Sequence, residues 1–337
     1  IEGAELIGET VSDYTITAGD VKLDIADLEK KYDAVLEPIF KNSLPKMPRP
    51  VSVAYDKGCD LLTNKAPGTI AKPKVLIPVF PGTNCEYDMA AAFNRYGGEA
   101  EIFVIRNLSA KNMEDSVNEF AKRIEDSQMI AVPGGFSGGD EPEGSAKFIN
   151  AFFRNPKIKD AVENMLYARD GLMIGICNGF QALIKLGLVP FGKIVPLSSE
   201  SPTLTYNTIG RHQSQLALTK ICTNKSPWLM HCKVGEVYNI PISHGEGRFV
   251  ASDEVIAKLI ENGQIATQYV DLNGEPTMDL AYNPNSSMCA IEGIISPDGR
   301  VLGKMGHTER ISSDTCVNVD GNKEQLLFKG GVDYFRI

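Results

Sequence analysis

The 337-residue sequence lacks the features that mark membrane-spanning and secreted proteins. No apolar run approaches the roughly 18 residues of a membrane-spanning helix. The N-terminus is acidic and carries no apolar stretch of the kind found in signal peptides. The seven cysteines form no CxxC pair, so they indicate neither a redox motif nor a paired-cysteine metal site. Together these absences predict a cytoplasmic protein with reduced thiols and no membrane partner.

Basic residues are also scarce. The chain has 34 Lys and Arg against 43 Asp and Glu, a net charge of -9 and a pI of about 5.1. Such a chain repels phosphate backbones, which argues against a nucleic-acid partner. The hydrophobic content of 43% is ordinary for a globular protein, and roughly 150 residues per domain predicts two domains or one with an appendage. The chain starts at Ile1 without Met, from which we expect a piece of something longer.

The first 72 residues differ from the rest. Alternating apolar residues at 14–25 predict a β-hairpin, and the pattern from residue 27 predicts one short helix. These elements alone are too small to bury a core. Four prolines between residues 38 and 50 interrupt helices and strands, so we interpret residues 41–72 as a linker. The predicted organisation is a hairpin-helix segment at 1–40, the linker, and one domain at 73–337.

From residue 73 onward, short apolar strands alternate with helical patterns. The predicted strands are 74–80, 99–105, 129–132 and 172–176, and the predicted helices are 87–96, 112–126, 146–153, 157–167 and 178–186. This alternation predicts an α/β fold with a doubly wound, mostly parallel sheet. In such sheets ligands bind beyond the carboxyl ends of the strands. The chain after residue 200 is richer in strands, at 216–222, 237–242, 265–270 and 288–295.

A single cysteine, Cys177, stands between the predicted strand at 172–176 and the helix that follows it, with Gly175 and Gly179 close by. This pattern is typical of a nucleophile elbow, where a tight turn exposes one side chain at the end of a buried strand. The helix N-terminus adds N–H groups and a positive dipole end, which favour the thiolate over the thiol. Cys177 is therefore the predicted nucleophile, and a structural buried cysteine is the alternative.

A glycine-rich loop follows the strand at 129–132. Its sequence, Pro-Gly-Gly-Phe-Ser-Gly-Gly-Asp, could hold an anion with backbone N–H groups or could be a plain turn. It is not a P-loop, because no Gly-Lys-Ser/Thr follows. If it lies beside Cys177, it can supply an oxyanion donor.

Only four histidines are available as a general base. His307 stands two residues before Glu309, and an extended segment would let the carboxylate orient the imidazole. His244 follows a predicted strand and is the competing candidate. His212 and His231 lie in polar, unpatterned contexts and are interpreted as structural or surface residues.

The Pro-Gly-Gly loop, Cys177 and the late His307–Glu309 pair follow one another along the chain, and they resemble the catalytic elements of class I glutamine amidotransferases, whose sheet is flavodoxin-like. Residues 81–88, 134–140 and 244–248 narrow the resemblance to the glutaminase domains of phosphoribosylformylglycinamidine synthases. The resemblance covers roughly residues 73–312. Residues 1–40 resemble the closing segment of the ATP-binding synthase domain, which precedes the glutaminase in the large, single-chain form.

The resemblance implies a carbon–nitrogen ligase that uses glutamine as amido donor. Cys177 attacks the glutamine amide to give a glutamyl thioester, with His307 as acid and base and Glu309 as its partner. The residues implied to bind glutamine or its oxyanion are Gly135, Phe136, Asn178, Gln181, His244, Gly245 and Glu246.

No metal or cofactor is implied for this chain. Ammonia would pass to the partner synthase domain, where ATP and Mg²⁺ are expected and where formylglycinamide ribonucleotide is amidated for purine biosynthesis.

Two residues depart from the family pattern. Thr308 stands where the family commonly has proline between the histidine and the glutamate, which changes backbone stiffness. Gly138 stands where a tyrosine is usual, and we expect it to loosen the loop. Cys85 also lies in a strand-end loop but lacks the elbow pattern. Arg248 and Arg310 could contact the glutamine carboxylate, the synthase domain or nearby acids.

Two other functions fit the same fold. A cysteine peptidase or related hydrolase would also carry an elbow cysteine, and a non-catalytic domain would bind glutamine without turnover.

Overall fold

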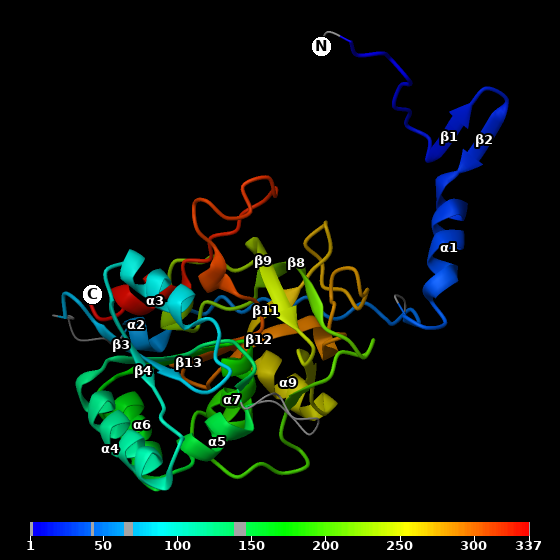
Figure 1. Cartoon of the computed structure of the whole chain (residues 1–337). Coiled ribbons are helices and arrows are strands. Elements are labelled where there is room, and N and C mark those ends of the chain that lie inside the picture. Colours follow the sequence, from blue (N-terminus) through cyan, green and yellow to red (C-terminus); the bar gives the residue numbers. More distant parts are fainter. Residues whose placement is uncertain (1–2, 42–43, 64–69, 138–145, 337) are drawn as a thin grey trace. The chain divides into compact units, whose positions relative to one another are not determined.

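A computed structural model describes residues 3–41, 44–63, 70–137 and 146–336 of the chain (Figure 1). It divides into two compact units, Ile1–Pro45 and Lys46–Ile337, which are described separately.

The first unit is a hairpin followed by a helix, as the sequence predicts. Strands β1 (Thr15–Ala18) and β2 (Val21–Asp24) pair antiparallel, and α1 (Ile25–Leu36) follows directly. The Asp24 side chain accepts a hydrogen bond from the Asp27 N–H and so begins the helix. No residue of α1 is buried, and this unit exposes several large apolar side chains: Ile16, Val21, Leu23, Tyr32, Val35 and Leu36.

A mixed sheet organises the second unit. Its strands lie in the order β4-β3-β5-β6-β13-β12-β11-β8-β9. The parallel strands are β3 (Lys74–Val79), β4 (Glu99–Val104), β5 (Met129–Val132), β6 (Leu172–Ile176) and β13 (Val301–Lys304). The antiparallel strands are β12 (Ile291–Ile295), β11 (Ile265–Tyr269), β8 (Gln213–Ile221) and β9 (Val237–His244). Two short strands, β7 (Thr203–Thr205) and β10 (Arg248–Val250), pair separately.

Helices cover both faces of the parallel strands (Figure 1). The helices of this unit, among the described residues, are α2 (Asp60–Thr63), α3 (Glu86–Arg95), α4 (Ala110–Asp126), α5 (Lys147–Phe153), α6 (Pro156–Glu163), α7 (Asn178–Leu186), α8 (Leu188–Phe191), α9 (Asp253–Glu261) and α10 (Leu327–Asp333). In Figure 1, α3 lies on one side of the sheet, while α4, α5, α6 and α7 lie on the other. This confirms the predicted doubly wound α/β fold. Among the described residues, no helix is both long and apolar enough to span a membrane.

The sequence did not predict β13, although this strand joins the parallel and antiparallel halves of the sheet. It is only four residues long, and glycine and charged residues flank its apolar positions. Such a segment has too little periodicity to stand out. It is completely buried, so its place depends on pairing with β6 and β12.

The boundary between the two units lies at Pro45, earlier than the end of the predicted linker at residue 72. Val53 is only 4% exposed, and its N–H donates to the Gln268 side chain at 2.9 Å. Tyr55 forms a bridge with Thr223. Proline content indicates breaks in regular structure, but a segment without helix or strand still packs where its apolar side chains find a surface.

Candidate active site

The carboxyl ends of β3, β5 and β6 meet at one edge of the sheet. The chain order reverses between β3 and β5, so their loops diverge from a switch point, which is the usual ligand site in such sheets. The two loops are tied together there. The Asn84 N–H donates to the Gly134 carbonyl at 3.1 Å, and the Phe136 N–H donates to the Gly82 carbonyl at 2.8 Å. The described start of the glycine-rich loop, residues 133–137, also lies beside the next strand end, because the Ser137 N–H donates to Asn178 Oδ1, next to Cys177, at 3.3 Å.

Cys177 lies at the corner between β6 and α7, as predicted. Its backbone has φ 53° and ψ -107°, a strained conformation for a residue with a side chain. The neighbouring glycines make this turn possible. A Cβ on Gly179 would lie 2.0 Å from the Val132 carbonyl oxygen, and one on Gly175 would lie 2.7 Å from Gly179. Backbones therefore approach more closely than any other residue would allow, which confirms the elbow geometry.

The surroundings of Cys177 oppose the thiolate that the helix N-terminus favours. Burial raises the pKa of the Cys177 thiol, and the nearby Cys85 and Glu309 raise it further. Arg310 and the Asn178 N–H oppose the shift without reversing it. The helix N-terminus is present, but removal of the sulfur from water outweighs it. Cys177 is consequently a thiol in this state and needs a base at the moment of attack.

A histidine–carboxylate pair supplies such a base. His307 Nδ1 lies 2.6 Å from Glu309 Oε1, and both side chains are buried. The His307 N–H donates to the Pro241 carbonyl at 2.8 Å, which holds the segment against β9. Among the described residues His307 Nε2 has no hydrogen-bond partner, so this nitrogen is available for proton transfer. His307 and Glu309, which the sequence placed two residues apart, are therefore hydrogen-bonded to each other in the structure.

Gly134 is the point at which the nucleophile and the base approach each other. A Cβ built on Gly134 would lie 2.7 Å from His307 Cε1 and 3.4 Å from Cys177 Cβ. The absence of a side chain here lets the imidazole and the elbow share the same small space. The structure thus brings together Cys177, His307 and Glu309, which lie far apart in the sequence.

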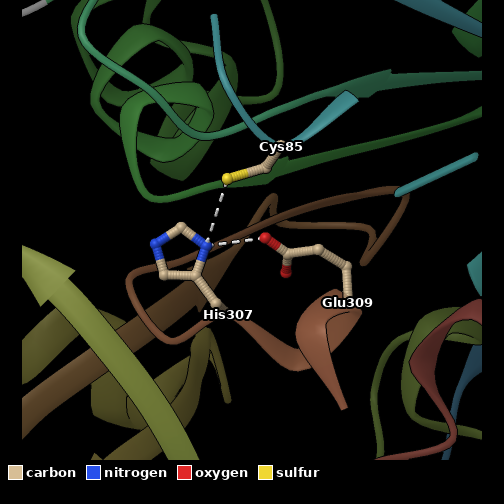
Figure 2. A group of neighbouring side chains, drawn as sticks. All are labelled: Cys85, His307 and Glu309. Atoms are coloured by element: carbon tan, nitrogen blue, oxygen red, sulfur yellow. Dashed lines mark hydrogen bonds and ion pairs between the residues drawn. The ribbon is translucent and has the colours of Figure 1, made fainter. Parts of the chain in front are cut away.

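Cys85 also reaches this space, which the sequence did not indicate. Figure 2 shows its sulfur and the Glu309 carboxylate directed at the same ring nitrogen of His307, Nδ1. The Cys85 Sγ to Nδ1 distance is 3.8 Å, and Arg310 Nη2 donates to the sulfur at 3.0 Å. Burial and then Glu309 raise the pKa of Cys85 to about 11, with Arg310 acting in the opposite direction.

One atom each from Cys85, His307 and Glu309 lie within 4.8 Å of one another, the one such metal-ligand group in the part of the chain that the structure describes. The donor set would suit a thiophilic cation. However, the Arg310 guanidinium already lies against the sulfur, and a cation would have to take Nδ1 from Glu309. We therefore interpret the group as part of the histidine–carboxylate pair.

His244, the competing base, lacks a carboxylate partner. It is 2% exposed, and its Nε2 lies 2.8 Å from Asn285 Oδ1. Burial and then the charge of His307 lower its pKa to about 3, with the Asn285 bond opposing. His244 therefore stays neutral. Its Nδ1 is buried and has no partner among the described residues, which suits a contact to a ligand.

A pocket of about 300 Å³ opens next to Cys177. Its lining includes six residues that the sequence analysis named besides the cysteine: Gly135, Phe136, Gln181, His244, Gly245 and Glu246, although Asn178 is not among them. The size and the mixture of apolar and charged walls fit a small polar molecule. These residues come from the β5 loop, α7 and the segment after β9, so the pocket depends on the whole sheet edge.

The amide side chains of Asn178 and Gln181 connect the walls of this pocket. Asn178 Nδ2 donates to Gln181 Oε1 at 2.8 Å, and Gln181 Nε2 donates to the Glu246 carbonyl at 2.6 Å. The Asn178 Oδ1 accepts from the Ser137 N–H at 3.3 Å. The amide oxygen and the amide nitrogen of Gln181 thus both form hydrogen bonds within the protein. Gln181 therefore shapes the pocket more than it binds a ligand.

Sequence reasoning missed several pocket residues: Tyr206, Gly210, Arg211, His212 and Ser243. His212, which we interpreted as structural or surface, bonds Ser243 Oγ at 3.1 Å and lines the pocket. The available signal was the adjacent Arg211 and His212 next to a strand start. His231 bonds Asp333 at 2.8 Å, in keeping with a structural role. Gly138 lies outside the described residues, so the expected loosening of the loop is not addressed.

Residues 72–335 match the model of the CobB/CobQ-like glutamine amidotransferase domain. Phosphoribosylformylglycinamidine synthase subunit PurQ from Chlorobium chlorochromatii is 34% identical over 262 residues, which is 75% of this chain and 93% of that subunit. The PurQ subunit from Aquifex aeolicus is 33% identical over 74% of this chain and 95% of its own length.

A solved structure is similar as well. A chain in the structure of PurLQS from Thermotoga maritima superimposes with a TM-score of 0.55 at 26% identity. The match covers 78% of this chain and 99% of that one.

Proposed function

The chain belongs to the family of CobB/CobQ-like glutamine amidotransferase domains, and we propose from this premise that it hydrolyses glutamine through Cys177, His307 and Glu309. It is the glutaminase component of a phosphoribosylformylglycinamidine synthase and serves purine biosynthesis. The observation that carries the proposed chemistry is the meeting of the Cys177 elbow and the His307 ring around Gly134. The peptidase and non-catalytic alternatives are not favoured.

The first half of the reaction forms a thioester. As glutamine binds, His307 Nε2 takes the proton from the Cys177 thiol while the sulfur attacks the side-chain amide carbon. The protonated His307 is stabilised by Glu309, which keeps the proton of Nδ1 in a hydrogen bond. The tetrahedral intermediate then collapses, and His307 gives its proton to the departing ammonia.

The second half releases glutamate. Water loses a proton to His307 Nε2 and attacks the thioester carbon, and the Cys177 sulfur leaves and recovers the proton. The sum is glutamine plus water giving glutamate plus ammonia. Because the resting Cys177 is a buried thiol, the site is unreactive until a substrate is present to accept the sulfur.

Two backbone N–H groups are proposed to hold the oxyanion. The Asn178 N–H follows the nucleophile at the start of α7 and lowers the pKa of the Cys177 thiol, and we assign it as the first oxyanion donor. The Phe136 N–H donates to Gly82 and is engaged. We therefore assign the second donor to the Gly135 N–H.

The pocket offers opposite charges for the two charged groups of glutamine. Glu246 carries the negative charge for the α-amino group, and Arg211 carries the positive charge for the α-carboxylate. The neutral His244 contributes its Nδ1 to the polar part of the ligand. This arrangement uses one sequence-predicted pair, His244 and Glu246, and one residue that only the structure revealed.

The ammonia acceptor is a synthase partner, where ATP and Mg²⁺ act. The solved relative is part of a PurLQS assembly, which supports such a partner for this chain. The proposed organisation assigns residues 1–40 to the end of a synthase domain, 41–72 to the connector and 73–337 to the glutaminase. The exposed apolar side chains of β1, β2 and α1 support this, because they need a covering surface. We also propose a cytoplasmic location, which the purine-pathway role supports.

The proposal is tested by glutamate release from glutamine, with the synthase portion added to the full chain. Cys177→Ala should abolish release and prevent labelling by a glutamine-like chloroketone, because no other thiol lines the pocket among the described residues. Cys222→Ala is the matched control, since Cys222 is buried in the core elsewhere. Glutamate release by Cys177→Ala at the control rate would contradict the proposal.

A further inference from the structure

A buried ion pair lies behind the catalytic histidine. Lys304, the last residue of β13, and Glu292, on the adjacent strand β12, are 1% and 0% exposed. Their Nζ and Oε1 atoms are 3.2 Å apart. Taking two charges out of water is unfavourable unless further hydrogen bonds satisfy them. The further hydrogen bonds of Lys304 and Glu292 therefore indicate the role of the pair.

Those bonds converge on the residues that flank His307. Lys304 Nζ donates to the Gly306 carbonyl at 3.0 Å and to Thr308 Oγ1 at 3.1 Å. Glu292 Oε1 accepts from the Gly306 N–H at 2.5 Å. Both backbone groups of Gly306 are thus held by the pair, immediately before His307, and the side chain immediately after it is held as well.

The surrounding residues leave this arrangement little freedom. Glu292 also accepts a hydrogen bond from Thr267, and Thr308 donates to Gln325 Oε1 at 2.8 Å. A Cβ on Gly306 would lie 2.9 Å from Glu292 Oε1 and 3.0 Å from Lys304 Nζ. Only glycine lets the backbone reach the two charged groups at once.

We infer that the Lys304–Glu292 pair is a positioning device that fixes the backbone on both sides of His307 for proton transfer. This inference rests on the proposed function. Neither residue lines the pocket, so both act through His307. The backbone at position 308 needs such restraint, because Thr308 has no ring to restrict it as a proline would. Its hydroxyl instead joins the pair.

The inference predicts a loss in kcat with little change in KM. A misplacement of about 1 Å in a catalytic group can lower the rate about 100-fold. The hydrogen bonds of the pair go to Gly306, Thr308 and Thr267, and none of these residues lines the pocket. Glutamine should therefore bind almost normally while proton transfer fails.

The test is the double variant Glu292→Leu/Lys304→Met in the full chain with the synthase portion added. Removing both charges leaves no unpaired buried ion, so the variant is expected to fold. We expect kcat for glutamate release to fall about 10- to 100-fold and KM to change less than about twofold. A folded double variant with unchanged kcat would overturn the inference.

Rescue separates positioning from general damage. Adding Thr308→Pro to the double variant should restore most of kcat, because position 308 begins the 3₁₀ turn Thr308–Arg310, where proline fits. The control variant Arg300→Met/Asp170→Asn removes an ion pair from the opposite end of β13. It should lower the melting temperature without lowering kcat. Equal kcat losses in the two double variants would make the Lys304–Glu292 pair merely structural.

A spectroscopic readout distinguishes a failure of this inference from a failure of the proposed function on which it rests. The His307 Nδ1–H proton, bonded to Glu309 at 2.6 Å, should resonate far downfield in the wild type. It should move or broaden in Glu292→Leu/Lys304→Met and return with Thr308→Pro. An unchanged resonance would overturn the positioning role. Failure of the wild type to release glutamate, or full release by Cys177→Ala, would instead overturn the proposed function.

Discussion

Cys85 and Cys177 occupy similar places in the fold. Each follows a parallel strand, β3 or β6, and each caps the N-terminus of the next helix, α3 or α7. Both thiols are buried, and burial raises the pKa of both. Both also lie close to Gly134 and to the His307 ring. Strand-end position and a helix N-terminus therefore do not distinguish a nucleophile from its neighbour.

Cys85 and Cys177 differ in their backbone geometry and in the residues around them. Cys85 has φ -109° and ψ 18°, a relaxed conformation, whereas Cys177 has the strained positive φ of an elbow. Cys177 lines the pocket, and Cys85 does not. Cys85 faces His307 Nδ1, which already bonds Glu309, and its sulfur accepts from Arg310. We propose that access to the pocket decides which of the two thiols reacts.

Among the variants that probe the difference between Cys85 and Cys177, Glu309→Gln is expected to lower glutamate release the most. The amide would favour the wrong imidazole tautomer and leave His307 Nε2 protonated, so glutamate release should fall roughly 10³- to 10⁴-fold. The measurement is kcat of the full chain with the synthase portion. Glu324→Gln, at an exposed glutamate bonded to Tyr96, is the matched control. A loss below about tenfold would mean that Nδ1 is oriented by something other than Glu309.

Gly134→Ala should have the next largest effect. The new methyl group would lie 2.7 Å from His307 Cε1, 3.3 Å from Cys85 Sγ and 3.4 Å from Cys177 Cβ, so it must push the base away from the thiols. We expect kcat to fall about 100-fold. Gly98→Ala, where a side chain of Val332 lies 3.2 Å away, controls for crowding outside the site. Wild-type kcat in Gly134→Ala would refute the shared space between nucleophile and base.

Cys85→Ala should change kcat by less than about fivefold, because this thiol lies on the Nδ1 side of the ring, outside the proton path. The Cys85→Ala variant should still be labelled at Cys177 by the chloroketone. The assay is the same glutamate release, with Cys59→Ala as a control at another buried cysteine. A loss as large as that of Cys177→Ala would erase the distinction between the two thiols.

The smallest effect concerns stability at high pH. The folded-state pKa of Cys85 is about 11, above its ordinary value of 9.0, so folding favours the protonated thiol. This contribution is present below about pH 9 and is lost as the pH rises toward about 11. The melting temperature of the wild type should therefore fall more steeply than that of Cys85→Ala between about pH 8 and about pH 10.5. Parallel slopes in thermal unfolding would contradict a raised pKa.

Much of the site could be predicted from the sequence because strong local patterns mark it. The apolar run before Cys177 and the glycines beside it describe an elbow, and the spacing of His307 and Glu309 suits a pair. Other features have no local pattern. Lys304 and Glu292 look like ordinary polar residues beside short strands, and Arg211 looks like a surface charge. Their roles depend on neighbours from other strands.

The protonation state of Cys177 likewise could not be predicted from local sequence patterns. The helix N-terminus is visible in the sequence and favours a thiolate, but the degree of burial is not visible and proves the stronger effect. Burial depends on residues from distant parts of the chain, such as Gly135, Phe136 and His244, which line the same pocket as Cys177.

By itself, the sequence determined the alternation of strands and helices, the elbow at Cys177 and the candidate base. Apolar periodicity and glycine positions act over a few residues, so they can be read locally. Only the tertiary structure decided that Cys85 shares the site, that His244 has no carboxylate partner and that Lys304 and Glu292 hold the segment of His307. These outcomes depend on contacts between residues far apart in the chain, and such contacts exist only after the sheet has assembled.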